Sequence, residues 1–225
     1  MARLTPANTN SDSVVVVGLG RFGGSVATSL VHLGHEVLGI DENPDVVQRF
    51  SETLSHVVQA DATSSEALRQ LGVADFDRAV VGIGSDIEAS VLTVLALDEL
   101  GIQDIWAKAI SPKHGRILER TGAHHVIHPE AAMGERVAHL VTGKMIDFIE
   151  FDDGFAIAKT NAPHEALGKM LSESALRSRY GITVVGIKRA RADFTYARPE
   201  TLVEKGDLLI VSGPTERVES FAALT

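Results

Sequence analysis

The first half of the chain alternates short apolar runs with segments of helical periodicity. It opens on four consecutive valines at 14–17, a pattern typical of a strand buried on both faces. The apolar runs predict strands at 14–17, 36–40, 56–59, 78–83, 104–110 and 124–128. The segments between and after them predict helices at 25–33, 44–53, 64–71, 87–100, 112–120 and 130–141. This alternation predicts an α/β fold with a doubly wound, parallel, Rossmann-like sheet.

The pattern changes near residue 143. Short alternating strands are predicted at 145–150, 155–159, 182–188 and 208–211, with a turn at Asp152-Asp153-Gly154 and a helical stretch at 167–179. These elements predict a second, smaller α+β domain at 143–225, after a first domain at 14–142. Residues 1–13 are polar and are predicted to be a disordered N-terminal tail.

A glycine-rich turn, Gly18-Leu19-Gly20-Arg21-Phe22-Gly23, follows the four valines and opens a helical segment. Gly18, Gly20 and Gly23 fit a turn that lets a phosphate approach the backbone at a helix N-terminus. Asp41 ends the next apolar run, near the spacing at which a carboxylate meets a ribose hydroxyl. Because this carboxylate would repel a 2′-phosphate, NADP is disfavoured.

Several other polar or glycine positions fall at predicted strand ends, among them Asp61, Gly84 and Lys108. In doubly wound sheets, ligands bind beyond the carboxyl ends of the strands. The convergence of these positions with Gly20 and Asp41 therefore predicts one nucleotide site. A solvated surface residue is the alternative reading of Arg21 and Lys108.

The composition of the chain excludes some classes of function. The chain has 225 residues, a formal net charge of −9 and no cysteine. The charge argues against non-specific binding to nucleic acid or anionic membranes, and the absence of cysteine fits a cytoplasmic setting. No apolar run approaches the roughly 20 residues of a spanning helix, so a membrane role is expected to come through a partner.

The chain resembles the cytoplasmic RCK (regulator of potassium conductance) proteins of the KtrA, KtrC and TrkA type. The matching motifs of the first half are Gly-Leu-Gly-Arg-Phe-Gly at 18–23, Ala-Asp-Ala-Thr at 60–63, Gly-Ile-Gly-Ser-Asp at 82–86, Ile-Trp-Ala-Lys-Ala at 105–109 and Val-Ile-His-Pro-Glu at 126–130. Those of the second half are Arg-Tyr-Gly-Ile at 179–182, Gly-Ile-Lys-Arg at 186–189 and Gly-Asp-Leu-Leu-Ile-Val at 206–211.

The resemblance implies that the first domain binds ATP or ADP, with NAD or NADH as the alternative seen in other members of the family. It implies that Arg21 reaches the phosphate of a neighbouring subunit's nucleotide and that Asp61, Ala62 and Thr63 flank the adenine. The residues implied to bind the nucleotide are Gly18, Gly20, Arg21, Phe22, Gly23, Asp41, Asp61, Ala62, Thr63, Gly84, Ser85, Lys108 and Glu130.

The resemblance also implies a cation site. Glu130, together with the γ-phosphate of ATP, is implied to hold a divalent cation, magnesium or calcium, at a dimer interface. From the sequence alone, Glu130 is better explained as a first-turn residue that complements the helix dipole. The family further implies cyclic di-AMP binding in the second domain, with candidate residues Ile182, Val184, Val185, Arg189 and Pro199.

In the family, rings of dimers, here expected to be octameric, gate a separate membrane potassium-transport subunit of the KtrB, KtrD or TrkH type. The resemblance therefore implies a regulatory subunit at the inner face of the cell membrane. The helix at 87–100 has more apolar surface than one sheet face needs, which also favours burial between subunits.

The sequence offers no catalytic motif, so we expect no enzyme. An NAD-linked oxidoreductase is the alternative function, and a nucleotide-binding scaffold without a switch is a third. His124, His125 and His128 lack a recognised metal-ligand spacing, and ordinary packing explains them better than a zinc site. His114 and His139 are predicted at the surface and Trp106 in the core.

Overall fold

The computed structural model describes residues 13–142, 145–151 and 153–224. The predicted tail therefore lies outside the described residues except for Ser13, as does Asp152 of the predicted turn. By its internal contacts the chain divides into two compact units, the first ending at Glu130 and the second beginning at Ala131. The predicted boundary near residue 142 stays a prediction, and each unit is described by itself.

The first unit is built on a parallel sheet of six strands in the order β3-β2-β1-β4-β5-β6. The strands are β1 (Ser13–Val17), β2 (Glu36–Asp41), β3 (His56–Gln59), β4 (Arg78–Val81), β5 (Asp104–Lys108) and β6 (His125–Ile127). The strand order reverses between β1 and β4, which is where ligands bind in such sheets. The predicted doubly wound fold is confirmed.

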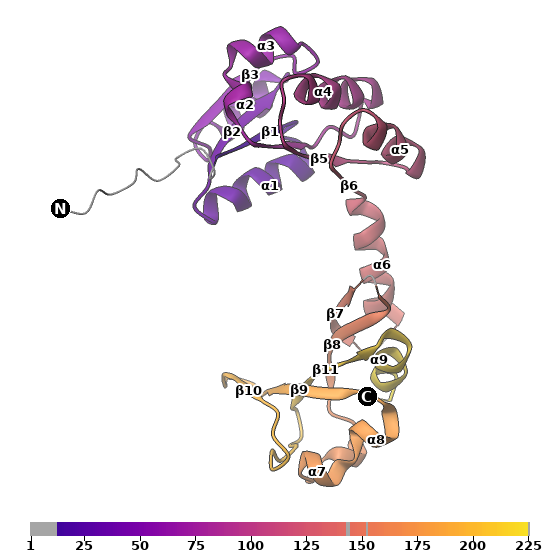
Figure 1. The fold of residues 1–225 in the computed structure, drawn as a ribbon. Coiled ribbons are helices and arrows are strands. Elements are labelled where there is room, and N and C mark those ends of the chain that lie inside the picture. The colour runs from indigo at the N-terminus through magenta and orange to yellow at the C-terminus, as the bar shows by residue number, and fades with distance from the viewer. Residues whose placement is uncertain (1–12, 143–144, 152, 225) are drawn as a thin grey trace, which may run out of the picture. The chain divides into compact units, whose positions relative to one another are not determined.

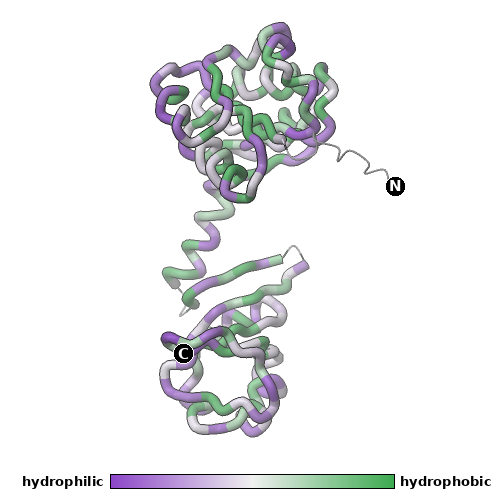
Figure 2. Tube along the Cα trace, turned by 90° about the vertical axis from the view of Figure 1, so that its left-hand side faces the viewer, coloured by the Kyte–Doolittle hydropathy of each residue, from purple (hydrophilic) through white to green (hydrophobic). Residues whose placement is uncertain are grey.

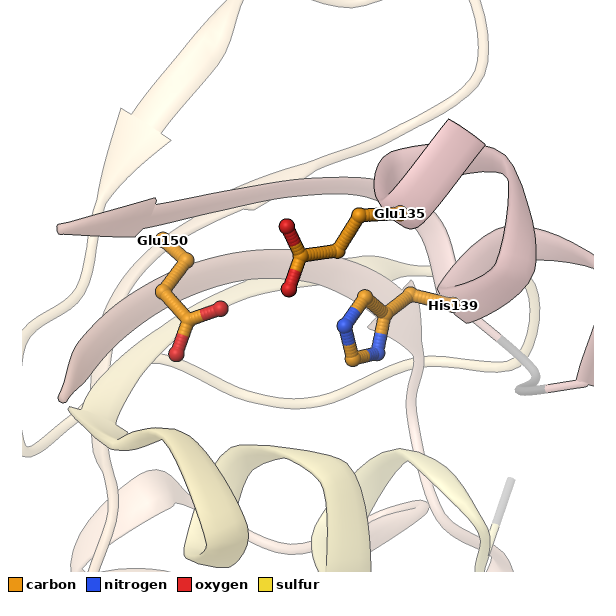
Figure 3. Close-up of side chains that lie close together, drawn as sticks. All are labelled: Glu135, His139 and Glu150. Atoms are coloured by element: carbon orange, nitrogen blue, oxygen red, sulfur yellow. The ribbon is translucent and has the colours of Figure 1, made fainter. Parts of the chain in front are cut away.

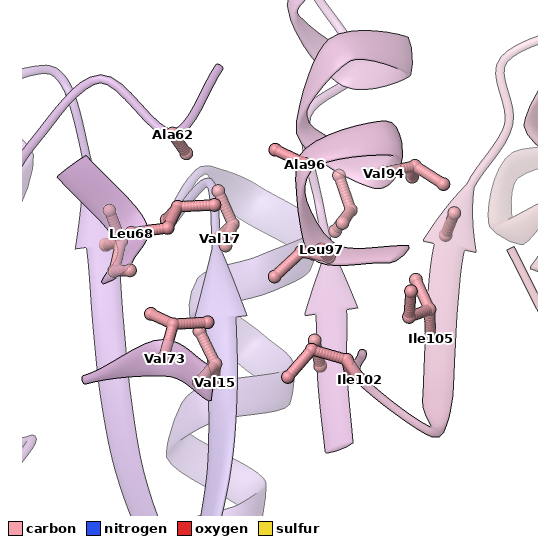
Figure 4. Close-up of a cluster of buried hydrophobic side chains, with 14 of the residues drawn as sticks. Val15, Val17, Ala62, Leu68, Val73, Val94, Ala96, Leu97, Ile102 and Ile105 are labelled. Atoms are coloured by element: carbon pink, nitrogen blue, oxygen red, sulfur yellow. The ribbon is translucent and has the colours of Figure 1, made fainter. Parts of the chain in front are cut away.

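Helices cover both faces of this sheet (Figure 1). One face packs on α1 (Arg21–His32) and α2 (Pro44–Phe50). The other packs on α3 (Ser65–Gln70), the short 3-10 turn η1 (Val73–Asp75), α4 (Ile87–Glu99) and α5 (Pro112–Arg120). Val15, Val17 and Leu97 meet in this second core (Figure 4), so the central valine strand is buried on both faces, as predicted.

Helix α1 begins at Arg21, four residues before its predicted start. Gly23 and Gly24 lie in this helix where it passes so close to its neighbours that a side chain would not fit. A Cβ at Gly24 would lie 2.4 Å from Cζ of Phe50 on α2. The helix thus begins directly after the turn that follows β1, which the low helix propensity of glycine would not predict.

The second unit contains an antiparallel sheet in the order β10-β9-β11-β8-β7. The helix α6 (Pro129–Thr142) leads into it. Its strands are β7 (Met145–Phe151), β8 (Phe155–Asn161), β9 (Thr183–Lys188), β10 (Phe194–Tyr196) and β11 (Leu208–Pro214). Its other helical segments are η2 (His164–Ala166), α7 (Leu171–Ser174), α8 (Leu176–Tyr180) and α9 (Thr215–Ala222). Buried apolar side chains form a core within each unit; Figure 2 colours the chain by hydropathy.

Three features of the second unit differ from the sequence expectations. The helix expected at 167–179 is broken, because Ala175 adopts a left-handed conformation with φ +53° between α7 and α8. Strand β10 was not predicted. Helix α9 was not predicted, although Phe221 and Val218 of this helix are fully buried in the unit's core.

Two burial predictions in the first unit are wrong. Trp106, expected in the core, is 38% exposed and stacks on His125 with ring centroids 4.0 Å apart. His114, expected at the surface, is a buried residue of α5, and its Nδ1 accepts a hydrogen bond from the Ile110 backbone N–H at 3.4 Å. His124 is exposed, and its Nδ1 accepts a hydrogen bond from the Ile105 N–H.

Among the described residues, no helix has the length and apolarity needed to cross a membrane.

Burial makes His114 a source of pH-dependent stability. Desolvation, and secondarily the charge of His128, lowers the pKa of His114 from its ordinary value of 6.5. As the pH falls through that ordinary value, the unfolded chain takes up a proton that the folded chain does not. The free energy of unfolding of this unit therefore falls on acidification.

His114→Asn removes this titration and keeps an acceptor for the Ile110 N–H. Urea unfolding between about pH 7 and pH 5 should show a smaller loss of stability in the variant than in the parent chain. The control is His32→Asn, at an exposed helix end. Equal pH dependence in the parent and the His114 variant would contradict this account.

Candidate functional site

A cavity of about 420 Å³ lies at the carboxyl ends of β1, β2, β4 and β5. Every residue predicted to bind a nucleotide lines it except Gly23. The predicted lining residues are Gly18, Gly20, Arg21, Phe22, Asp41, Asp61, Ala62, Thr63, Gly84, Ser85, Lys108 and Glu130. The fold thus brings together residues that are more than a hundred positions apart in the sequence. The volume of the cavity is within the range of small-molecule sites.

The glycines of the turn have different roles. Gly18 has φ +82°, a left-handed conformation that favours glycine. A Cβ at Gly23 would lie 1.9 Å from the Gly18 carbonyl oxygen, and one at Gly82 would lie 2.8 Å from the same atom. Gly23 therefore allows α1 to lie against the turn, which explains why it does not line the cavity.

Gly20 faces open space. An added Cβ there would have no heavy atom within 4 Å. Gly20 caps α1 without a side-chain hydrogen bond, and the first turn of α1 has no acidic residue. The positive end of this helix is therefore uncompensated and faces the cavity, as expected of a site for a phosphate group.

Asp41 holds the glycine turn in place, a role that the sequence did not reveal. One carboxylate oxygen accepts a hydrogen bond from the Leu19 N–H at 2.7 Å. The other accepts from the Asn43 N–H at 2.9 Å. Each oxygen retains a free lone pair, so Asp41 can still accept a hydrogen bond from a ribose hydroxyl.

Asp61 and Thr63 form a local turn on the same rim. The Asp61 Oδ1 accepts from the Thr63 hydroxyl at 2.6 Å and from the Thr63 N–H at 2.9 Å. These two hydrogen bonds hold the pKa of Asp61 below its ordinary value. With Asp41, the cavity therefore has two acidic side chains at the ends of β2 and β3.

A lysine–glutamate pair closes the other side of the cavity. Lys108 Nζ donates to Glu130 Oε1 at 2.6 Å, with only 12% of the lysine side chain exposed against 67% of the glutamate. The ammonium also lies 5.8 Å from the centre of the Phe22 ring, within cation–π range. Gly84 leaves room for it, since a Cβ there would lie 3.2 Å from Lys108 Nζ.

The hydrogen bond from Lys108 is the main reason that the pKa of Glu130 is lowered, and the positive charge of Arg21 adds to it. Two cations and one carboxylate therefore meet at this wall. The net positive charge suits a ligand with several phosphate oxygens.

Thr93 is a lining residue that the sequence reasoning missed. It lies on α4, its side chain is buried, and its hydroxyl has no hydrogen-bond partner among the described residues. An unpaired buried hydroxyl costs free energy unless something satisfies it. A threonine in an apolar helix gives no sequence signal, so only the fold could identify it.

Glu130 cannot hold a cation with this unit's residues alone. Among the described residues, no group of three or more metal-ligating side chains includes it. A hard cation here needs oxygen ligands from another source, such as a phosphate or water. The residues present fit a cation bound together with a ligand phosphate.

The candidates for cyclic di-AMP binding lie in the second unit. Ile182 is buried in its core and is unavailable to a ligand. The Arg189 Nε donates to Asp207 at 3.0 Å, and its Nη2 donates to the Leu202 carbonyl at 2.9 Å. This guanidinium is therefore engaged inside the unit, while Val184, Val185 and Pro199 are at least partly exposed.

Comparisons with known proteins agree with this geometry. Residues 14–129 match the TrkA-N domain and residues 156–225 match the TrkA-C domain. The chain is 36% identical over 207 residues to Ktr system potassium uptake protein C of Bacillus subtilis (strain 168), covering 92% of this chain and 94% of that protein. It is 35% identical to protein A of the same organism, covering 92% and 93%.

Solved structures show the same fold. The GsuK RCK domain has a TM-score of 0.67 at 21% identity, covering 99% of this chain and 50% of that chain. A crystal structure of GsuK bound to ADP matches at 25% identity with a TM-score of 0.50, covering 60% and 35%. The two Bacillus subtilis relatives are named as potassium uptake proteins. Neither name denotes an enzyme, which agrees with the expectation that this chain is not one.

The different surroundings of Gly20 and Gly23 give a paired test. Gly20→Ala should fold, losing about 1 kcal/mol or less from the weaker helix cap. Its methyl group would occupy the space in front of the helix terminus, so ADP should bind at least about tenfold more weakly, or ~1.4 kcal/mol. Calorimetric titration with ADP measures this.

Gly23→Ala should act on stability instead. Its Cβ would collide with the Gly18 carbonyl, with a cost of about 2 kcal/mol or more, visible as a lower melting temperature without ligand. If Gly20→Ala binds ADP as tightly as the parent chain, the terminus of α1 is not the phosphate site.

Proposed function

This chain, with its TrkA-N and TrkA-C domains, belongs to the family of Ktr-type potassium uptake proteins, and from that membership we propose that it is the nucleotide-sensing regulatory subunit of such a system. The observation that carries the proposal is the cavity at the carboxyl ends of the strands, with the uncompensated terminus of α1 and the Lys108–Glu130 pair both on its wall.

An adenine nucleotide fits the groups on the cavity wall. The phosphates would meet the N–H groups at the start of α1 together with Arg21 and Lys108. The ribose would meet Asp41, whose negative charge disfavours a 2′-phosphate. The adenine would lie beside Ala62 and Thr63. The unpaired Thr93 hydroxyl offers a further hydrogen bond to the ligand.

The Lys108–Glu130 pair is the part of this site that could distinguish ATP from ADP. A third phosphate would draw the mostly buried Lys108 ammonium toward itself. The exposed Glu130 carboxylate, released from its partner, would then share a divalent cation with the γ-phosphate. ADP lacks that phosphate, so the ion pair would remain as it is and no cation would bind.

Exposed apolar side chains support self-association. On α4, Ile87, Leu92 and Leu95 are 44%, 39% and 39% exposed. On α6, Met133 and Val137 follow each other at a spacing of one helical turn and are 55% and 46% exposed. Apolar surface of this kind marks interaction sites. We propose that copies of the chain associate through such surfaces into dimers and then a ring.

The ring would act on a membrane potassium-transport subunit from the cytoplasmic side. Nucleotide exchange can gate that partner only if ATP binds one ring state better than the other. A coupling free energy of about 1–3 kcal/mol is typical of such switches. The cation shared by Glu130, and Arg21 reaching a neighbouring subunit's nucleotide, are our candidates for that difference.

Calorimetry of the full chain with ATP, ADP and NADH, each with and without magnesium or calcium, tests this proposal. We expect both adenine nucleotides to bind and the cation to tighten ATP alone. Glu130→Gln should abolish the cation effect and leave ADP affinity within about twofold, since Glu130 meets only the third phosphate's cation.

The control is Glu66→Gln, a first-turn glutamate of α3 that also pairs with a cation, Arg69. It should leave both affinities and the cation effect unchanged. Equal losses of ATP and ADP affinity in Glu130→Gln would contradict the assigned role of Glu130. A clear preference for NADH would contradict the ATP/ADP assignment as a whole.

A further inference from the structure

A second group of potential metal ligands lies outside the nucleotide cavity. Glu135 and His139 on α6 and Glu150 on β7 each offer one ligand atom, and these atoms lie within 4.8 Å of one another. Figure 3 shows the three side chains converging from the helix and the neighbouring strand. All three residues belong to the second unit, so the arrangement is defined within one compact body.

The elements explain the convergence. Residues four apart on a helix lie on one face, so Glu135 and His139 point the same way from α6. Glu150 lies on β7, the strand that follows α6 in the chain. The His139 ring packs on Phe148 of the same strand, with ring centroids 4.6 Å apart, which brings the imidazole to the strand that carries Glu150.

A second layer of residues on α9 orients two of the three ligands. The His139 Nδ1 lies 2.9 Å from Glu219 Oε1. This contact leaves the other ring nitrogen, Nε2, free, and in Figure 3 one ring nitrogen faces the two carboxylates. The Thr215 hydroxyl donates to Glu150 Oε1 at 2.8 Å. Metal-binding histidines commonly donate their second ring N–H to a carboxylate in this way.

The charges of the cluster also favour the binding of a cation. Three carboxylates, those of Glu135, Glu150 and Glu219, surround a single imidazole. Within the described ranges, none of the three forms an ion pair with a lysine or arginine, and the nearby Arg136 pairs with Asp147. Like charges this close repel one another, and a divalent cation would relieve that repulsion.

We propose that Glu135, His139 and Glu150 form a zinc site, completed by water. Zinc accepts both imidazole nitrogen and carboxylate oxygen as ligands, at distances of about 2.0–2.2 Å. Magnesium and calcium prefer an all-oxygen shell, so the imidazole favours zinc over both. The ion ties α6 to β7, and α9 supports the ligands from the second layer.

This inference does not depend on the proposed nucleotide function. The test uses the full chain carrying Glu130→Gln, so that the cavity contributes no cation site, with no nucleotide present. Zinc is titrated against a competing chromophoric chelator after removal of metals. One zinc ion should bind per chain, and zinc should raise the melting temperature.

We expect His139→Ala to weaken zinc binding by more than about a hundredfold, and the double variant Glu135→Gln/Glu150→Gln to do the same. The second-layer change Glu219→Ala should weaken it less, by roughly 10- to 100-fold. The control His164→Ala, at an exposed histidine of the same unit, should bind zinc as the parent does. Cobalt substituted for zinc should give a visible absorption band that His139→Ala changes.

Zinc binding that is unchanged in His139→Ala would overturn the site. So would an equal loss in His139→Ala and His164→Ala, which would indicate scattered surface histidines. Melting without metal checks folding: a variant that melts like the parent but no longer gains stability from zinc supports the proposal. Calcium or magnesium binding as tightly as zinc would overturn the choice of metal.

Discussion

The close approach around the carbonyl oxygen of Gly18 is the constraint on which the first unit depends. Strand β4 arrives at Gly82 and helix α1 at Gly23, both too near this oxygen to allow a side chain. The Asp41 carboxylate then fixes the turn by accepting the Leu19 N–H. Because the backbone closes so tightly here, the terminus of α1 opens onto the cavity at the point where the strand order reverses.

A second part of the cavity wall is held by electrostatic interactions. The Lys108 ammonium lies mostly buried between the Phe22 ring and the Glu130 carboxylate. Glu130 belongs to the first turn of α6, the helix that also carries Glu135 and His139. A change of partner at Glu130 would therefore act on a helix whose later turns form part of the second unit. The proposed zinc site would fasten those later turns to β7.

The sequence predicted the positions of some residues correctly and those of others wrongly. Local patterns identified the six parallel strands, and glycines and strand-end residues identified the cavity wall, because the carboxyl ends of parallel strands meet at one edge. Gly23 does not line the cavity, because it lies at a close contact between elements that the sequence does not show. The sequence also did not show that Thr93 lines the cavity, that Trp106 is exposed or that His114 is buried. These properties depend on which helix covers which part of the sheet. The proposed zinc site joins α6 to β7 and takes its second layer from α9, a helix that the sequence did not predict, so spacing along the chain did not reveal it.

The central claim is that nucleotide exchange in this cavity rearranges an assembly of copies. The chain has no cysteine, so Glu52→Cys, in an exposed turn after α2, gives a single site for a spin label. Pulsed electron–electron double resonance spectroscopy then measures the distances between spin labels on different copies of the chain. The account predicts distinct distance distributions with ATP plus magnesium and with ADP. One distribution shared by both nucleotides, or no distance between copies at all, would contradict it.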